Sequence, residues 1–275
     1  MRQATLRSPV RFEGVGLHTG AQSSVEVLPA AANAGLTFAL GSVRVPATAE
    51  YVIDTSRATV LGRDGASVST TEHLLSALFA MGVSNAEIVV TGPEIPVRDG
   101  SSAEFAAAIA AAGIETQDAA RATVSVEAPM VVRDGDKMVA VFPSQAFRIR
   151  FVADFPEPVG TQYYDGAVDA QTYGDEIAAA RTFGYLHEVE ALRARGLALG
   201  GSLDNAIVFA PDGPMQPLRW PNEVVRHKVL DLIGDFALLG AWPLCEIVAI
   251  KSGHALHAQV TRELRARMPE LATER

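Results

Sequence analysis

Two histidines, His73 and His227, lie 154 positions apart, and each opens a predicted helix that is followed by the same elements. In both places a strand comes next, and then a second helix that a glycine-containing turn precedes. The turn glycines, Gly100 and Gly253, are 153 positions apart. One nearly constant offset across a helix, a strand and a helix indicates an internal duplication, to which chance similarity of two common units is the alternative. A chain with such a repeat is expected to fold as two halves of the same architecture.

Each half begins with strand-like alternation of apolar and polar residues and ends with helices. The predicted elements are strands over 24–28, 36–40 and 87–90 with helices from Glu72 and over 103–112, then strands over 123–127, 138–142, 148–152 and 246–250 with helices from Arg226-His227 and from His254. Strands followed by helices favour α+β layers over a doubly wound parallel sheet. A polar stretch near 115–122 is the predicted boundary, which gives domains of residues 1–118 and 119–275.

The second half carries an inserted unit, about 181–209, that has no counterpart in the first half. A helix is predicted over 181–195. The glycine pair Gly200-Gly201 breaks the helical pattern after it, and 206–209 resembles a strand. Apolar residues recur at helical spacing in this unit, namely Tyr185, Leu186, Val189 and Leu192. By periodicity alone, this is an amphipathic helix that covers the core.

Composition excludes several classes of protein. Hydrophobic residues make up 48% and charged residues 20%, as in a globular protein. The net charge of −9 argues against a nucleic-acid binder, although a local basic pocket for an anionic small molecule stays open. Cys245 is the only cysteine, which rules out an internal disulfide and a thiolate zinc site. Without a signal segment or an apolar run long enough for a bilayer, we expect a cytoplasmic protein with no transmembrane segment and no obligate protein partner.

A polar stripe runs along the helix that contains His227. His227, Asp231 and Asp235 are spaced i, i+4 and i+8, so they share one face of a helix that is otherwise apolar nearly all round. Burial of two carboxylates is costly unless a cation or strong donors meet them. A histidine and an aspartate one turn apart are placed to share a metal ion. The stripe is therefore the predicted centre of the functional site.

Glu72 and His73 lie in the first turn of the matching helix, with Thr70 or Thr71 as its predicted cap. Taken alone, Glu72 complements the helix dipole and His73 is an ordinary surface or core histidine. Because the duplicate helix carries His227 at the matching place, we instead predict a site of two histidines and one carboxylate. Glu72 would then be free to act as a general base.

The other histidines carry weaker signals. His254 opens the final helix, either as a capping residue or as an acid that faces the metal. His18 lies in a glycine-rich turn that lacks phosphate-loop spacing, and it receives a supporting role at most. His187 and His257 have no partner pattern and are predicted to be solvated helix residues.

Motifs along the chain come in the order of one known family. They are Thr71-Glu72-His73-Leu74, Gly92-Pro93-Glu94-Ile95-Pro96, Asp99-Gly100-Ser101, Ala180-Arg181-Thr182-Phe183-Gly184, Gly200-Gly201-Ser202, the run from Val225 to Asp231, Gly234-Asp235 and Lys251-Ser252-Gly253-His254. The chain thus resembles the zinc-dependent UDP-(3-O-acyl)-N-acetylglucosamine deacetylases of lipid A biosynthesis, from about Thr5 to the last helix. The resemblance implies two duplicated α+β layers, each a mainly antiparallel sheet packed against two helices.

The resemblance also implies a metal centre and a reaction. One Zn²⁺ per chain would be bound by His73, His227 and Asp231, with Fe²⁺ as an alternative metal. Glu72 would be the general base that activates water for attack on the acetamide of a UDP-acyl-sugar. His254 would be the cation or acid near the scissile amide, and the sequence leaves open whether it shares the proton transfers with Glu72.

Further roles follow only from the resemblance. Thr182 would donate to the oxyanion, and Asp235 would hold His254 in place. The inserted unit, from Phe183 to Ser202, would form an apolar passage for the acyl chain. The implied substrate-binding residues are Lys228, Lys251, Lys137, Asp154, Phe155, Phe183, Tyr185, Val189, Ala198 and Ser202. The departures from the family pattern are a threonine at Thr71 in place of a commoner valine and a short linker after Phe209.

Two other functions compete with this interpretation. Two histidines and a carboxylate also hold Fe(II) in oxygenases, but nothing in the sequence resembles the strand-borne ligands of those enzymes. A catalytically idle relative that binds a nucleotide-sugar or a lipid would have lost Glu72 or a metal ligand, and this sequence has lost neither.

Overall fold

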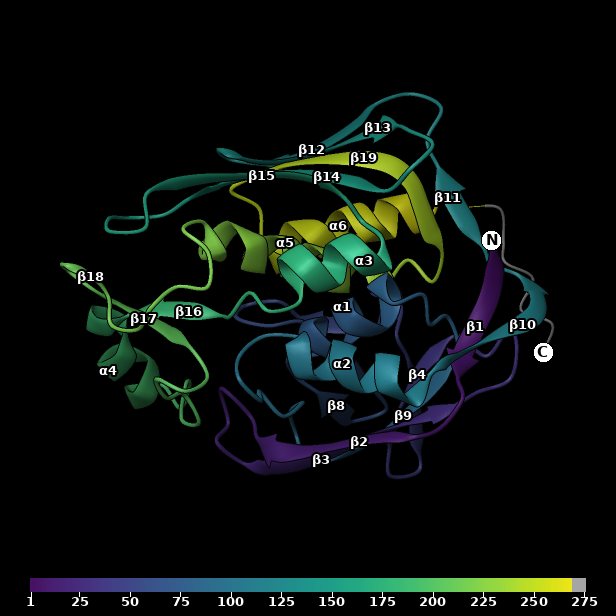
Figure 1. Ribbon diagram of the computed structural model, residues 1–275, viewed down its shortest axis with the longest axis horizontal. Helices are drawn as coiled ribbons and strands as arrows, with labels where there is room; N and C mark the ends of the chain where they lie inside the picture. The colour runs from purple at the N-terminus through teal and green to yellow at the C-terminus, as the bar shows by residue number, and fades with distance from the viewer. Residues whose placement is uncertain (269–275) are drawn as a thin grey trace.

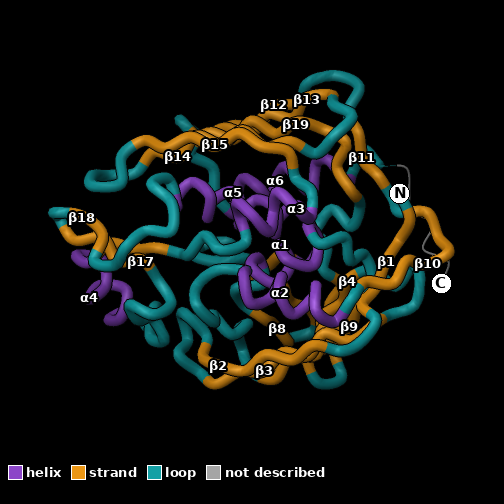
Figure 2. Tube along the Cα trace, in the orientation of Figure 1, coloured by secondary structure: helices purple, strands orange, loops and turns teal. Residues whose placement is uncertain are grey.

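A computed structural model describes residues 1–268, and residues 269–275, which the predicted second domain includes, lie outside the described part of the chain. Figure 1 shows two sheets on the outside of the molecule with helices between them. The same order of layers is visible in Figure 2, where the helices lie between two groups of strands. Within residues 1–268, none of the helices combines the length and the apolar character that crossing a bilayer requires.

The first half contains a five-stranded sheet and two helices. In spatial order the strands are β2 (Val10–Val15), β3 (Gln22–Pro29), β9 (Ala86–Thr91), β4 (Leu36–Leu40) and β5 (Val43–Pro46), and the helices are α1 (Glu72–Ala80) and α2 (Ala103–Ala112). Smaller elements are the 3₁₀ turn η1 (Ala49–Tyr51), the sheet of β6 (Val52–Asp54), β7 (Val60–Arg63) and β8 (Ala66–Val68), and the pair β1 (Arg2–Leu6) and β10 (Ile114–Ala120).

The second half repeats this plan. Its sheet contains β12 (Met130–Asp134), β13 (Lys137–Pro143), β19 (Trp242–Ile250), β14 (Arg148–Asp154) and β15 (Thr161–Ala167), with β11 (Thr123–Ser125) beside β19. Its helical elements are α3 (Ala170–Thr172), the π-helical turn η2 (Tyr173–Ile177), α5 (Glu223–Ala237) and α6 (His254–Arg265). The inserted unit contains β16 (Phe183–Tyr185), α4 (Leu186–Ala194), β17 (Ile207–Ala210) and β18 (Gly213–Pro214).

The order and the direction of the strands are the same in both sheets. β9 is antiparallel to β3 and parallel to β4, and β19 is antiparallel to β13 and parallel to β14. The outer strands of each sheet pair antiparallel with their neighbours. The predicted α+β class is confirmed, and the matching strand order supports the duplication.

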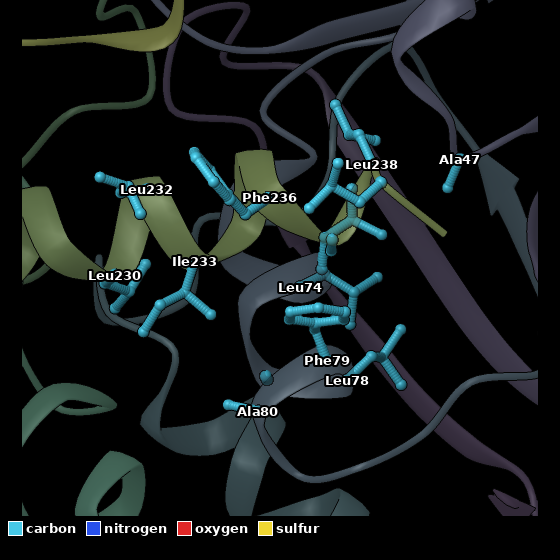
Figure 3. Packing of buried hydrophobic residues seen from close by; sticks show 14 of the residues in the cluster. Ala47, Leu74, Leu78, Phe79, Ala80, Leu230, Leu232, Ile233, Phe236 and Leu238 are labelled. Atoms are coloured by element: carbon cyan, nitrogen blue, oxygen red, sulfur yellow. The ribbon is translucent and has the colours of Figure 1, made fainter. Parts of the chain in front are cut away.

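The two helical layers share one apolar core. α1 packs against α5, and Figure 3 shows side chains of both helices in the same cluster. Leu74 and Leu78 of α1 and Ile233 and Phe236 of α5 are fully buried. Each such side chain contributes roughly 1.5–3 kcal/mol through removal of apolar surface from water. This core fixes the position of α1 relative to α5, and both carry predicted site residues.

Three predicted elements differ from the structure. The segment 181–195 is not one helix, because 183–185 pair in parallel with β17 and the helix begins only at Leu186. The helix predicted to open at Arg226-His227 begins one turn earlier, at Glu223. The expected linker near 115–122 is largely the strand β10, which pairs with β1. The division of the chain at residue 118 remains our proposal.

Candidate metal and catalytic site

The site lies where the beginning of α1 meets the middle of α5. At this crossing Gly234 approaches the backbone of Glu72 so closely that a Cβ atom on residue 234 would lie 2.1 Å from the Glu72 carbonyl oxygen. Only glycine allows this approach. It brings the rings of His73 and His227 to a centroid distance of 5.0 Å, nearly perpendicular to each other.

Both imidazoles face one carboxylate. His73 Nε2 lies 3.7 Å and His227 Nε2 lies 3.5 Å from Asp231 Oδ1. All three residues are buried, with exposed fractions of 3–4%. Among the described residues, they form a group whose candidate ligand atoms lie within 4.8 Å of one another. The structure therefore brings together the three residues that the sequence predicted as metal ligands.

The chemistry of this group fits a zinc ion. Two ligand atoms, each about 2.0–2.1 Å from a tetrahedral zinc ion, lie about 3.4 Å apart, close to the observed separations. Within residues 1–268, no donor reaches the buried Asp231 Oδ1, and a bound cation would satisfy this orphaned carboxylate oxygen. His227 Nδ1 lies 3.1 Å from the Ala180 carbonyl oxygen. Donation from Nδ1 to that oxygen leaves the Nε2 lone pair free for a metal.

Protonation states agree with this role. Burial, and then the neighbouring His227, lower the pKa of His73 to about 3, so that the imidazole is neutral. Burial would raise the pKa of Asp231, but His227 and Lys228 outweigh it and hold the pKa below its ordinary value. Lys228 Nζ donates to Asp231 Oδ2 at 2.7 Å, which leaves Oδ1 directed at the two histidines. Two neutral imidazoles and one carboxylate are a common ligand set of catalytic zinc.

Glu72 and His254 form a second pair beside this group. Glu72 Oε1 lies 4.0 Å from His254 Nε2, and Glu72 Oε2 accepts a hydrogen bond from the Thr59 backbone N–H at 3.0 Å. Burial raises the pKa of Glu72 to about 7, although His254 opposes the shift. Burial disfavours the charged form of His254, but Asp235, Glu72 and Asp231 outweigh it and raise the pKa of His254 to about 9. At neutral pH a proton acceptor therefore faces a protonated imidazole.

Asp235 lies behind His254, where the resemblance placed it. Its Oδ2 accepts a hydrogen bond from His254 Nδ1 at 2.9 Å, and its Oδ1 accepts one from Thr59 Oγ1. Burial would raise the pKa of Asp235, but its histidine partners lower it to about 2. The aspartate thus stays ionised and fixes the ring of His254.

The prediction for His257 was wrong. This residue is fully buried, and its Nδ1 lies 2.8 Å from Asp235 Oδ2. The i, i+3 spacing from His254 places both rings on one face of α6, and this spacing was the available signal. His187, by contrast, is exposed as predicted.

Sequence reasoning also missed Thr59, which hydrogen-bonds both Glu72 and Asp235. Thr71 lies at the N-cap position of α1, one of the two predicted, but its hydroxyl donates to the Thr59 carbonyl oxygen and makes no capping hydrogen bond. Thr70 donates to Glu94 instead. No motif in the sequence marks Thr59, because its partners lie 13 and 176 positions away.

Thr182 lines the cavity beside the metal group, and both its backbone N–H and its backbone carbonyl oxygen are hydrogen-bonded. Its N–H donates to the Gly100 carbonyl oxygen at 2.8 Å, and its carbonyl oxygen accepts from Ile207 N–H. The preceding residue, Arg181, binds the fully buried Glu223 through both its backbone N–H and its guanidinium group. Because Glu223 opens α5, this ion pair ties the Thr182 segment to the helix of His227.

A cavity of about 940 Å³ extends from the metal group into the inserted unit. The proposed site residues that line it are Glu72, His73, Lys137, Phe155, Thr182, Phe183, Tyr185, Val189, Ala198, Ser202, His227, Lys228, Asp231 and His254. Apolar residues of the inserted unit extend the wall, among them Leu192, Leu203 and Val208. The cavity thus joins a buried polar end to an apolar one.

Two proposed substrate residues do not line this cavity. Lys251 Nζ forms ion pairs with Asp154 at 2.7 Å and with Asp136 at 3.0 Å, on the surface beside the cavity.

His18 does line the cavity, and Glu94 holds the His18 turn by accepting from the backbone N–H groups of His18 and Thr19. The turn is therefore a fixed part of the cavity wall.

Comparison with known proteins gives matches over nearly the whole chain. A family model described as UDP-3-O-acyl N-acetylglycosamine deacetylase matches residues 3–266. A UDP-3-O-acyl-N-acetylglucosamine deacetylase of Syntrophotalea carbinolica is 45% identical over 271 residues, which cover 96% of this chain and 88% of that protein. Proteins of the same name are 45% identical in Phenylobacterium zucineum, with 97% and 94% covered, and 44% identical in Myxococcus xanthus, with 95% and 86% covered. The similarity includes both halves and the inserted unit.

Proposed function

The chain belongs to the UDP-3-O-acyl-N-acetylglucosamine deacetylase family, and from this premise we propose that it is a zinc-dependent amidase of lipid A biosynthesis. It removes the acetyl group of a UDP-3-O-acyl-N-acetylglucosamine as acetate. His73, His227 and Asp231 hold one zinc ion per chain. The observation that carries the proposal is the orphaned Asp231 Oδ1 between two neutral imidazoles, beside Glu72 and His254 at the buried end of the cavity.

A zinc ion in this site supplies Lewis acidity and lowers the pKa of a bound water towards about 7. Glu72 accepts a proton from the attacking water, and a carboxylate with a pKa near 7 is suited to this task at neutral pH. The backbone N–H of Thr59 holds Oε2 of Glu72 and leaves Oε1 on the side of His254. The new C–O bond forms as the carbonyl oxygen becomes negative.

His254 and Thr182 act on the developing charge. The protonated His254 places a positive charge beside the reacting amide, while the hydroxyl of Thr182 donates to the oxyanion. A donor of this kind contributes roughly 3 kcal/mol in comparable sites. When the C–N bond breaks, the leaving amine takes a proton from Glu72 or from His254, and acetate remains. We propose that His254 provides mainly charge, because Asp235 keeps it protonated.

The two ends of the substrate use different walls of the cavity. Lys137 supplies positive charge for the diphosphate, and the Lys251–Asp154 pair lies at the surface nearby. Lys228, whose Nζ donates to Asp231, lies beside the reacting end of the substrate. Phe183, at the start of the inserted unit, lies edge-on to Phe155 with ring centroids 5.0 Å apart and to His227 at 6.3 Å, so it adjoins the metal group. Beyond it, Val189, Ala198 and their apolar neighbours bind the acyl chain. Each buried methylene contributes about 0.8 kcal/mol.

The experiment is acetate release from UDP-3-O-acyl-N-acetylglucosamine by the purified full chain. We expect turnover with this substrate and much slower turnover with UDP-N-acetylglucosamine, which lacks the acyl chain. Glu72→Gln, which keeps the shape of the side chain but removes the base, is the matched control. Acetate release by this variant at the wild-type rate would come from a contaminating enzyme. Substrate binding without acetate release by the zinc-loaded wild type would instead indicate the idle binding protein and refute the proposal.

A further inference from the structure

His257 is a fully buried histidine that the proposed reaction does not use. It lies on α6, three residues after His254, and its ring is nearly perpendicular to that of Phe151. A buried imidazole without partners would be costly, yet both nitrogens of this ring are hydrogen-bonded. Its contacts therefore indicate a specific role.

The partners of His257 connect it to His254. His257 Nδ1 lies 2.8 Å from Asp235 Oδ2, the same oxygen that lies 2.9 Å from His254 Nδ1. His257 Nε2 lies 2.8 Å from Ser252 Oγ. One carboxylate oxygen thus accepts from two imidazoles, while Thr59 occupies the other oxygen.

These contacts define a single arrangement of protons. Asp235 is ionised and only accepts, so His257 must carry a proton on Nδ1. Burial keeps the pKa of His257 below its ordinary value, so its Nε2 is unprotonated and accepts from the hydroxyl of Ser252. His254 likewise donates from Nδ1, which directs its Nε2 towards Glu72.

Asp235, His254 and His257 also form a candidate metal group by distance alone. However, the two N···O distances of 2.8 and 2.9 Å are those of charge-assisted hydrogen bonds. Two ligands of one tetrahedral ion lie about 3.4 Å apart. The cluster is therefore a hydrogen-bonded network.

We propose that His257 is a positioning residue for the reaction: its Nδ1–H holds the Asp235 carboxylate in the orientation that keeps His254 Nε2 facing Glu72. The role rests on the proposed function, because His254 acts in that reaction. His257 itself does not reach the cavity. It acts through Asp235.

Two amide substitutions separate the two contacts of His257. In His257→Asn the amide nitrogen takes the place of Nδ1 and keeps the donor to Asp235, but the contact with Ser252 is lost. In His257→Gln the amide group takes the place of Nε2, so that Ser252 keeps a partner and Asp235 loses one donor. Both variants are neutral and polar, which makes them a matched pair for stability.

We expect His257→Gln to lower kcat about tenfold, the effect of one lost charge-assisted hydrogen bond, with KM and bound zinc unchanged. His257→Asn, which keeps the donor to Asp235, should keep kcat within about threefold of wild type. In an Asp235→Ala background, His257→Gln should change kcat no further, because the two residues act as one unit. Equal losses in both amide variants, or additive losses in the double variant, would overturn the proposal.

A spectroscopic readout keeps this test separate from the proposed function. The ring N–H proton of His254 that is bonded to Asp235 should give a low-field NMR resonance in wild type and in His257→Asn, and a shifted or exchange-broadened one in His257→Gln. Should wild type release no acetate, the proposed function fails while these spectra still decide on His257. An identical resonance in all three proteins would refute the positioning role.

Discussion

The pKa values of Glu72 and His254 are both raised above those of the free side chains, to about 7 and about 9. Burial favours the neutral carboxyl group of Glu72, while Asp235 and the other carboxylates around His254 favour its imidazolium form. Environments that push two pKa values in this way are typical of acid–base pairs in active sites. The shifted pKa values thus distinguish the pair that we propose to react from the three residues that we propose to bind metal.

Substitution of either residue of this pair should leave the metal in place. We expect Glu72→Gln and His254→Gln to retain bound zinc and to lose kcat by roughly 10²–10⁴-fold, the range for a general acid or base. The measurement is zinc content per chain alongside steady-state acetate release. A kcat like that of wild type in either variant would remove that residue from the mechanism.

The pH dependence follows from the two pKa shifts. Glu72 must be ionised, so kcat/KM should rise as the pH increases through its pKa, which is about 7 before the charge of a metal is added. His254 must be protonated, so kcat/KM should fall as the pH increases through its pKa, which is about 9, also before the charge of a metal is added. A bound dication lowers both values, because it opposes positive charge and favours negative charge.

We therefore expect a bell-shaped profile whose limbs lie below these two pH values. His254→Gln should abolish the alkaline limb and preserve the acid limb. Measurement of kcat/KM over the stable pH range of both proteins tests this assignment. Persistence of the same alkaline limb in His254→Gln would assign it to another group.

At the scale of elements, the inserted unit has a different character from the helices of the core. None of the residues of α4 is buried, whereas every residue of α1 is. The unit is held together instead by the pairing of its own strands β16 and β17, and it contacts the first half through Gly200, which lies against the turn at Gly16. A helix that is not committed to core packing can present its apolar side chains to a ligand.

A bulky residue inside the passage should discriminate between substrates. Val189→Phe is expected to raise KM several-fold for the long-chain substrate and to leave UDP-N-acetylglucosamine nearly unaffected, because only the acyl chain passes this residue. Ala198 is a poorer choice, since its φ of 52° would add backbone strain to any bulky change. Leu186→Phe, an exposed position on the same helix that does not line the cavity, is the matched control. Equal KM changes for both substrates would mean that the unit only covers the core.

The close crossing of α1 and α5 at Gly234 should be sensitive to any added side-chain atom. Gly234→Ala would place a Cβ 2.1 Å from the Glu72 carbonyl oxygen, so the helices must separate. We expect a loss of roughly 1–3 kcal/mol in the free energy of unfolding and a weaker affinity for zinc, because His73 and His227 move apart. Gly174→Ala, where no atom lies within 4 Å of the added Cβ, is the control. Zinc affinity and stability like those of wild type in Gly234→Ala would contradict this role of the crossing.

At the scale of the whole molecule, the duplication explains why the site lies between the halves. His73 comes from α1 of the first half, and His227 and Asp231 come from α5 of the second. Matching helices of the two halves therefore meet and together supply the proposed metal ligands. Neither half contains the three residues by itself, so metal binding depends on the packing of one half against the other.

Much of this arrangement was predictable because it is local in sequence. The i, i+4 spacing of His227 and Asp231 fixed one helix face, and the bounds of α2 follow from an alanine-rich run that ends at Gly113. The unpredicted parts depend on tertiary contacts. His257 is hydrogen-bonded to a partner 22 positions away, and Glu223, the first residue of α5, binds Arg181, 42 positions away. Periodicity carries no signal for such pairs.

The most direct measurement is titration of the metal-free protein with zinc while acetate release is followed. We expect no turnover without metal, a linear rise to one equivalent of zinc per chain, and a plateau. His73→Ala, His227→Ala and Asp231→Ala should each lose bound zinc and turnover together. Full turnover by the metal-free protein, or full zinc occupancy in these three variants, would contradict the assignment of the site.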